Sequence, residues 1–91
     1  MVLMPAFLKT PEEWLIWILG GEFNGHATRA QLSERTGFSE SRVEEELRNL
    51  ERIELLGAWR KAGKIEDVRL TSRGRSAFLG LKERSGEGWQ E

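Results

Sequence analysis

The sequence of 91 residues contains no cysteine. Disulfide bonds and thiolate metal sites are therefore excluded, and we expect a cytoplasmic protein, a location that the absence of cysteine permits. No apolar run approaches the roughly 20 residues that a membrane-spanning helix needs. The opening residues, MVLMPAFL, are apolar, but they lack a basic start and are too short for a signal peptide. We therefore expect no contact with a membrane.

Signatures of catalysis are missing as well. The sequence has no Gly-rich phosphate loop, no nucleophile elbow and no cluster of histidine with carboxylates. The single histidine, His26, has no second ligand near it, so we interpret it as a loop residue. Three consecutive acids, Glu44, Glu45 and Glu46, fan out over about 200° of a helix and cannot converge on one metal. We predict a protein that is not an enzyme and that needs no cofactor.

The length and composition indicate one small domain. Hydrophobic residues make up 38% of the chain and charged residues 32%, which is typical of a globular protein with a single core. We place the domain at residues 1–84 and a flexible tail at 85–91. The net charge is −1, but residues 57–84 hold eight basic and three acidic groups. Any basic surface must therefore come mainly from that segment.

The first predicted helix starts at Thr10-Pro11-Glu12-Glu13, where threonine caps, proline suits the first turn and glutamate completes a capping box. It ends at Gly20-Gly21. The helix is apolar almost all round, so more than one of its faces is buried. Trp14 and Trp17 point away from its main stripe and predict a homodimer interface. The alternative is that MVLMPAFL folds back over both tryptophans.

Two further helices are predicted between Thr28 and Leu56. Thr28-Arg29-Ala30-Gln31 is a capping box that starts the first of them. Gly37 can take the positive φ of a tight turn at no steric cost. Ser39 then caps a helix that runs from about Glu40 to Ile53 or beyond. Apolar residues recur along this pair at helical spacing and predict its buried face: Leu32, Phe38, Val43, Leu47, Leu50 and Leu56.

Residues 57–71 predict a β-hairpin. Gly63-Lys64 is the predicted two-residue turn, because a type II′ turn requires glycine first. This register pairs Trp59 with Val68, Arg60 with Asp67, and Lys61 with Glu66. Both charged pairs are opposite in sign, which favours the register, and alternation places Trp59 on the inner side. Thr71 or Ser72 then caps a last helix.

The stretch TRAQLSERTGFSESRVEEELRNLERIELL, followed by VRLTSRGRSAF, resembles winged helix-turn-helix regulators of the MarR and ArsR type over about residues 10–84. The spacing of its core and turn residues carries the resemblance. It implies a mainly α winged helix, with a three-helix core, a two- or three-stranded wing and a C-terminal helix. Glu54 stands where such regulators often have glycine, so Gly57 is expected to end the preceding helix.

The resemblance implies a small dimeric transcriptional regulator that binds double-stranded DNA. A DNA reader places the first residues of one helix at base edges and neutralises flanking phosphates with basic groups. Arg42 can pair with guanine, and Glu45 can accept a hydrogen bond from cytosine N4. The predicted nucleic-acid-binding residues are Thr28, Arg29, Ser39, Ser41, Arg42, Glu45, Arg48, Lys61 and Lys64.

The acidic residues of the same helix favour an alternative. Glu40, Glu44 and Glu45 are expected to be exposed there and to repel phosphates, although Glu44 can also pair with Arg48 one turn away. The alternative function is a winged-helix adaptor that binds a protein partner and not DNA. A DNA binder should place its arginines and lysines on one continuous surface, whereas an adaptor should show an acidic or apolar surface there.

Overall fold

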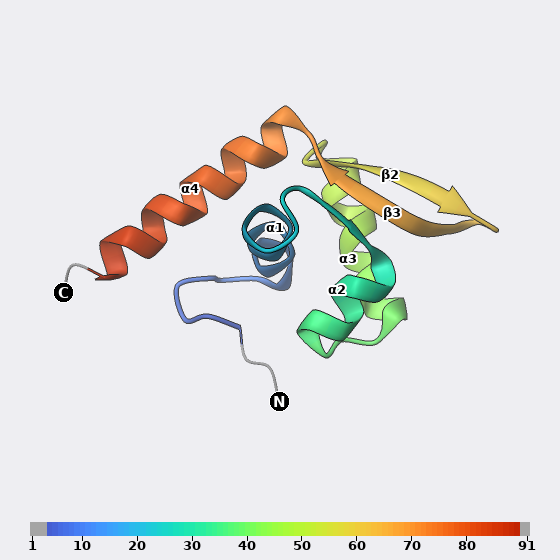
Figure 1. Ribbon diagram of the computed structural model, residues 1–91, viewed down its shortest axis with the longest axis horizontal. Helices are drawn as coiled ribbons and strands as arrows, with labels where there is room; N and C mark the ends of the chain where they lie inside the picture. Colours follow the sequence, from blue (N-terminus) through green and yellow to red (C-terminus); the bar gives the residue numbers. More distant parts are fainter. Residues whose placement is uncertain (1–3, 90–91) are drawn as a thin grey trace.

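The computed structural model describes residues 4–89, with side chains described through residue 86. In this range the chain forms α1 (Pro11–Gly21), β1 (His26–Thr28), α2 (Arg29–Thr36), α3 (Glu40–Arg52), β2 (Leu56–Lys61), β3 (Lys64–Leu70) and α4 (Ser72–Trp89). The strands form one antiparallel sheet in the order β1-β3-β2. Figure 1 shows the hairpin of β2 and β3 extending from a helical body. The predicted winged helix is confirmed, with a three-stranded wing.

The core surrounds α1, which lies between α4 on one side and α2 and α3 on the other (Figure 1). Leu15, Ile18 and Leu19 of α1 are fully buried. Leu47 of α3 and Val68 of β3 are buried in the same cluster. Each such side chain stabilises the fold by roughly 1.5–3 kcal/mol, so the packing around α1 fixes the wing and the helix-turn-helix to one body.

The predicted helix starts are confirmed at three positions. The Thr10 hydroxyl accepts from the Glu13 amide at 3.2 Å. In the Thr28 capping box, the hydroxyl accepts from the Gln31 amide at 3.0 Å and the Gln31 side chain accepts from the Thr28 amide at 2.9 Å. Ser39 accepts from the Arg42 amide at 3.2 Å. Gly37 takes φ of 81° between the last two, so local sequence fixes how α2 turns into α3.

The two tryptophans of α1 are packed within the same chain. Trp14 is buried and meets the Phe38 ring edge-on, with centroids 5.5 Å apart. Trp17 lies between Phe7, at 5.0 Å, and Phe78 of α4, at 5.5 Å. The N-terminal segment therefore does fold over Trp17, although residues 1–3 lie outside the described range. Trp14 is therefore buried without a second subunit, whereas Trp17 is partly buried within the chain.

Helix α3 ends earlier than the sequence suggested. Its last residue is Arg52, and Glu54 itself takes the left-handed conformation, with φ of 66°. Gly57, the expected end of the helix, lies inside β2, and Leu56 is the buried first residue of that strand. The Leu55 amide donates to the Leu50 carbonyl at 3.0 Å and so closes the end of the helix. This bond forms even though a positive φ is unfavourable for a non-glycine residue such as Glu54.

The predicted register of the hairpin is wrong. The turn is Ala62-Gly63, with φ of 54° and 80°, and not Gly63-Lys64. Trp59 lies opposite Asp67 and Arg60 opposite Ile65, so β3 carries one extra residue as a bulge. Ile65 and Val68 are both buried but lie three positions apart, so strict alternation would place them on opposite faces of the strand. The extra residue of the bulge brings both side chains to the inner face. Trp59 consequently faces outward and is 53% exposed.

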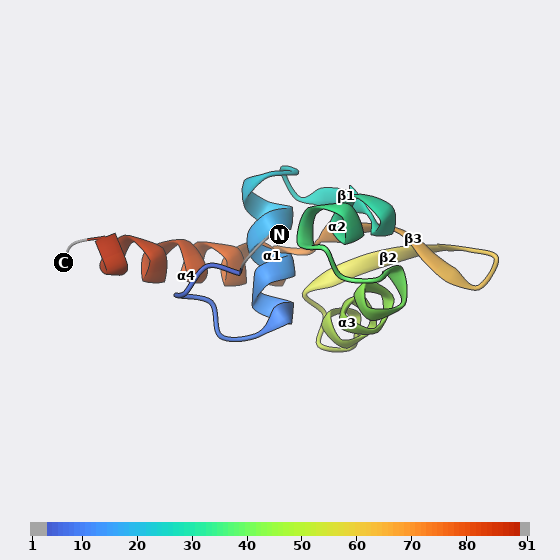
Figure 2. The ribbon, with the colours of Figure 1, turned by 90° about the horizontal axis from the view of Figure 1, so that it is seen from below.

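Helix α4 begins at the predicted cap, since the Thr71 hydroxyl accepts from the Gly74 amide at 3.1 Å. It packs on α1 as far as Arg84, which donates to Glu13 at 3.0 Å, and its C-terminal end extends away from the wing, as Figure 2 shows. The helix continues through Trp89, whereas the sequence predicted a tail at 85–91, of which residues 90–91 lie outside the described range. Among residues 4–89, no helix has both the length and the apolar character needed to cross a bilayer.

Candidate nucleic-acid interface

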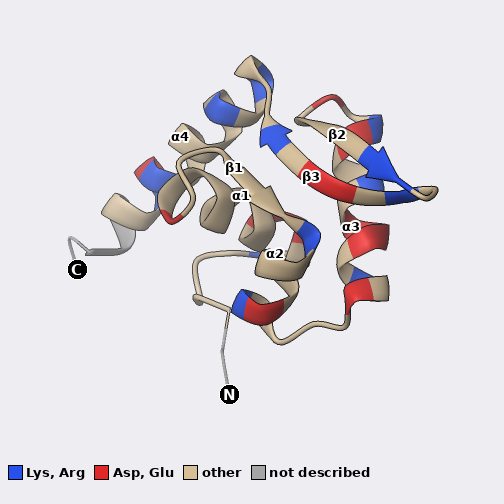
Figure 3. Cartoon of the chain, turned by 45° about the vertical axis from the view of Figure 1, so that its right-hand side comes forward, with Lys and Arg blue, Asp and Glu red and all other residues tan. Residues whose placement is uncertain are grey.

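An open groove of about 690 Å³ lies between α3, the start of α2 and the start of β3. The side chains that line it are Arg29, Glu40, Ser41, Glu44, Glu45, Arg48 and Lys64. Five of these seven belong to the predicted nucleic-acid-binding set. Figure 3 shows basic residues at the free end of the hairpin and acidic residues along α3. The fold thus brings the first turns of α3 and the wing to one surface, as DNA reading by a winged helix requires.

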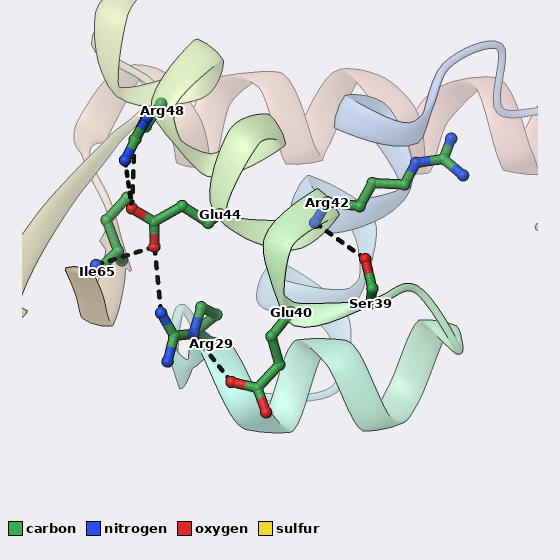
Figure 4. A network of polar contacts seen from close by, with 7 residues as sticks. All are labelled: Arg29, Ser39, Glu40, Arg42, Glu44, Arg48 and Ile65. Carbon is green, nitrogen blue, oxygen red and sulfur yellow. Dashed lines mark hydrogen bonds and ion pairs between the residues drawn. The ribbon is translucent and has the colours of Figure 1, made fainter.

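Glu44 lies at the base of this groove and joins three elements (Figure 4). One carboxylate oxygen accepts from the Ile65 amide of β3 at 3.0 Å and from Arg29 of α2 at 3.3 Å. The other accepts two bonds from Arg48, at 3.2 and 3.0 Å. The predicted pair of Glu44 with Arg48 is confirmed. The prediction that Glu44 is exposed is wrong, because only 11% of its side chain reaches solvent.

The Glu44 carboxylate is held in its charged form. Burial by itself raises the pKa of Glu44, but the Ile65 amide, Arg29 and Arg48 together lower it below its ordinary value. Glu44, the first acid of the glutamate triplet, therefore serves as an internal anchor between α3 and the wing. Both of its carboxylate oxygens already accept hydrogen bonds from protein donors, so it presents little charge to an approaching phosphate.

Arg29 is shared between two carboxylates. Its Nε donates to Glu40 at 3.1 Å, while Nη1 donates to Glu44 at 3.3 Å. The two acids differ in exposure, since 55% of the Glu40 side chain is open to solvent. Arg29 itself is 19% exposed. Arg29, predicted to contact a phosphate, therefore lies at the groove, but its donors face acids of the same chain.

Arg42 points away from the groove. Its guanidinium lies over the Phe38 ring, 4.0 Å from the centroid, and its Nε is 3.9 Å from Glu46. Figure 4 shows the side chain running in the opposite direction from Arg29 and Arg48. Burial and the neighbouring Glu12 raise the pKa of Glu46, which faces α1. The three members of the glutamate triplet thus occupy three environments, and Glu45 is the one of these three that is exposed in the groove.

Two further predicted residues act as caps. The hydroxyls of Thr28 and Ser39 accept main-chain hydrogen bonds at the starts of α2 and α3, as described above. Both residues therefore fix the backbone at the starts of the two helices. Ser41, in the first turn of α3, is exposed and lines the groove beside Glu45. Side chains at the start of α3 are thus positioned at the groove surface.

The end of the wing carries lysines. Lys61 and Lys64 face each other across the Ala62-Gly63 turn, and both are exposed. Within the described side chains, neither has a carboxylate at ion-pairing distance. The predicted pairing of Lys61 with Glu66 is therefore wrong. Arg60 does not pair with Asp67 either, because it donates two bonds to Glu51 of α3, at 3.0 and 2.7 Å.

The groove as a whole is balanced in charge. Its lining has three basic side chains against three acidic ones. Arg29 and Arg48 are paired with glutamates, whereas Lys64 adds positive charge at the wing. Sequence reasoning missed the roles of Glu40 and Glu44 as partners of Arg29. The spacing of Glu44 and Arg48 was a visible signal, but Arg29 meets both acids only through the fold.

The groove shows no arrangement for a metal. Among the residues that the structure describes, no group of three or more histidine or acidic side chains is placed to hold an ion. The nearby His26 lies on the sheet, 3.5 Å from Asp67.

The fold is that of winged helix-turn-helix regulators. AdcR, the adhesin competence repressor of Streptococcus pyogenes, superposes with a TM-score of 0.72 at 14% identity, over 91% of this chain and 61% of AdcR. MepR, a transcription regulator of the Staphylococcus aureus multidrug efflux pump MepA, gives 0.71 at 22% identity, over 92% and 63%. A mutant of Lactococcus lactis ZitR gives 0.71 at 18% identity, over 88% and 54%.

The chain thus spans about 54–63% of the length of these regulators. The sequence matches no family model and no curated protein. At these identities the superpositions establish the fold. They also match the fold that the resemblance implied from the spacing of core and turn residues.

Proposed function

We propose that this protein is a DNA-binding transcriptional regulator that presents the start of α3 to the major groove and its wing to the flanking backbone. The observation that carries the proposal is the groove, which gathers Ser41, Arg48 and Lys64 from α3 and β3 on one surface. The structures that share the fold include transcription regulators. Cytoplasmic location is part of the same proposal.

Base contacts are assigned to Ser41 and Glu45, which are exposed in the first turns of α3. A carboxylate can accept from cytosine N4, and a serine hydroxyl can donate or accept. Arg42 would have to leave the Phe38 ring before it could reach a guanine. Phosphate contacts are assigned to Lys61 and Lys64, since a wing that enters duplex DNA needs charge at its end.

The substitution Lys64→Ala should weaken binding to any duplex about five-fold at low salt, because one phosphate contact is lost whatever the sequence. Fluorescence anisotropy with a labelled duplex measures the effect. The matched control is Lys82→Ala, which removes the same charge from an exposed position on α4. Equal affinities for Lys64→Ala and Lys82→Ala would remove the wing from the interface.

We also propose that the working unit is a homodimer, which would present two copies of α3 to a two-fold operator. Trp14 and Trp17 were the predicted contacts, but both pack within the chain. The proposed contact therefore moves to the exposed face of α4, where Leu79 is 57% exposed. Sedimentation equilibrium should give twice the 10.5 kDa chain mass. Dissociation by Leu79→Glu would support this surface, and a monomeric wild type would exclude it.

A protein-binding adaptor is the second candidate. The observation that favours it is the charge balance of the groove, where Glu40 and Glu45 are both exposed. An adaptor should bind a duplex weakly and with little dependence on salt. The two functions therefore differ in one titration, which does not require the operator to be known.

A further inference from the structure

The contacts of Arg29 suggest how the groove changes when it binds DNA. Arg29 is the first residue of α2 and lines the groove together with Glu40 and Glu44. A guanidinium forms the same planar, charge-assisted bonds with a carboxylate and with a phosphate. The carboxylates that now face Arg29 therefore occupy the donors that a DNA phosphate would use.

The two carboxylates are not equally able to leave. Glu44 accepts four protein bonds, including the buried amide of Ile65, and its side chain is largely enclosed. Moving it would leave that amide without a partner in a buried position. Glu40 makes one described side-chain bond, to Arg29 Nε, and more than half of its side chain is open to solvent. Its carboxylate can turn into water without exposing any buried group.

Resting on the proposed function, we propose that Arg29 is a phosphate-binding residue whose Nε is occupied by Glu40 in the free protein, and that DNA displaces Glu40. Glu44 keeps its contact with Nη1 throughout and holds the guanidinium at the groove. The Glu40 carboxylate thereby competes with DNA from within the chain. This exchange weakens binding and makes it less dependent on salt, because the freed carboxylate recruits a cation when the phosphate releases one.

The substitution Glu40→Gln tests the exchange. It should tighten duplex binding about five-fold at low salt, because the neutral amide competes less well for Arg29 than the carboxylate. The slope of log K against log salt should steepen by about 1. The matched control is Glu34→Gln, an exposed acid of α2 with no ion pair among the described residues, which should change affinity by less than about two-fold. Glu40→Ala repeats the test with a different side chain.

A double-mutant cycle separates competition for Arg29 from general repulsion. In an Arg29→Gln background, Glu40→Gln should give no gain in affinity, because the group for which Glu40 competes is absent. A gain in affinity that persists in the Arg29→Gln background would overturn the proposal. The proposal would also be overturned if the wild type binds DNA and Glu40→Gln binds it no more tightly. If neither the wild type nor Glu40→Gln binds any duplex, the proposed function fails and this inference fails with it.

Discussion

Replacing Glu44 with alanine should lower the free energy of unfolding by about 3 kcal/mol. The change leaves the buried Ile65 amide without an acceptor and takes one carboxylate from both Arg29 and Arg48. Because these groups belong to β3, α2 and α3, the loss loosens the wing from the helix-turn-helix. Urea unfolding followed by tryptophan fluorescence measures the effect.

The neighbouring residue supplies the control. Glu45→Ala removes the same side chain from the next position of α3, where it is exposed and has no ion pair among the described residues. It should change stability by less than about 0.5 kcal/mol. The loss of stability for Glu44→Gln should lie between the losses for Glu44→Ala and Glu45→Ala, since an amide oxygen still accepts from the Ile65 amide. Similar losses for Glu44→Ala and Glu45→Ala would contradict the anchoring role.

The same anchor predicts a dependence on pH. Because the folded protein lowers the pKa of Glu44, its contribution to stability is present above the ordinary glutamate value and is lost as the pH falls below it. Glu13 and Glu51, whose pKa values are lowered chiefly by hydrogen bonds from Arg84 and Arg60, act in the same direction. Glu46, whose pKa burial raises, acts in the opposite direction. Glu44→Gln should therefore lose less stability on acidification than the wild type does.

Replacing Gly74 with alanine should destabilise the fold by about 3 kcal/mol or prevent folding. A Cβ at this position would collide with the Leu55 carbonyl oxygen and press on the Leu70 side chain. The same carbonyl accepts from the Thr71 amide at 3.1 Å. Relief of the clash would therefore separate the start of α4 from the start of β2, with loss of the cap.

Gly80 offers a test in the opposite direction on the same helix. An added Cβ there meets nothing within 4 Å, so Gly80→Ala should raise stability by about 0.5–1 kcal/mol through helix propensity. Thermal unfolding of the two variants compares them directly. A Gly74→Ala variant that is as stable as Gly80→Ala would contradict the close approach of α4 and β2.

Local features of the fold could be predicted from the sequence. The caps at Thr10, Thr28 and Ser39, and the turn at Gly37, depend on residues at most four apart, so their signals are contained in short stretches. The prediction of the turn in the wing was wrong for a reason that is also local. Ala62 is a poor residue for a positive φ, so the sequence did not mark the true turn. The bulge in β3 follows from core packing, which the sequence does not display.

The candidate site was harder to predict because its contacts join distant parts of the chain. Glu44 meets the Ile65 amide 21 positions away, and this contact turns an apparently exposed acid into a buried anchor. Arg29 and Glu40 lie 11 positions apart, with the rest of α2 and the turn at Gly37 between them. Arg42 was predicted to pair with guanine because it lies near the start of α3, but the Phe38 ring beside it gives the guanidinium a different partner. Residue positions on α3 were predictable, and side-chain directions were not.

The most direct test of DNA binding by this groove is the affinity of the wild type for a duplex of mixed sequence, titrated against salt. Binding through Lys61 and Lys64, with the Arg29 contact offset by release of Glu40, predicts that log K falls with log salt with a slope of about −2 or steeper, and that Lys64→Ala reduces the slope by about 1. No binding at low salt, or a slope near zero, would contradict the account and favour a protein partner.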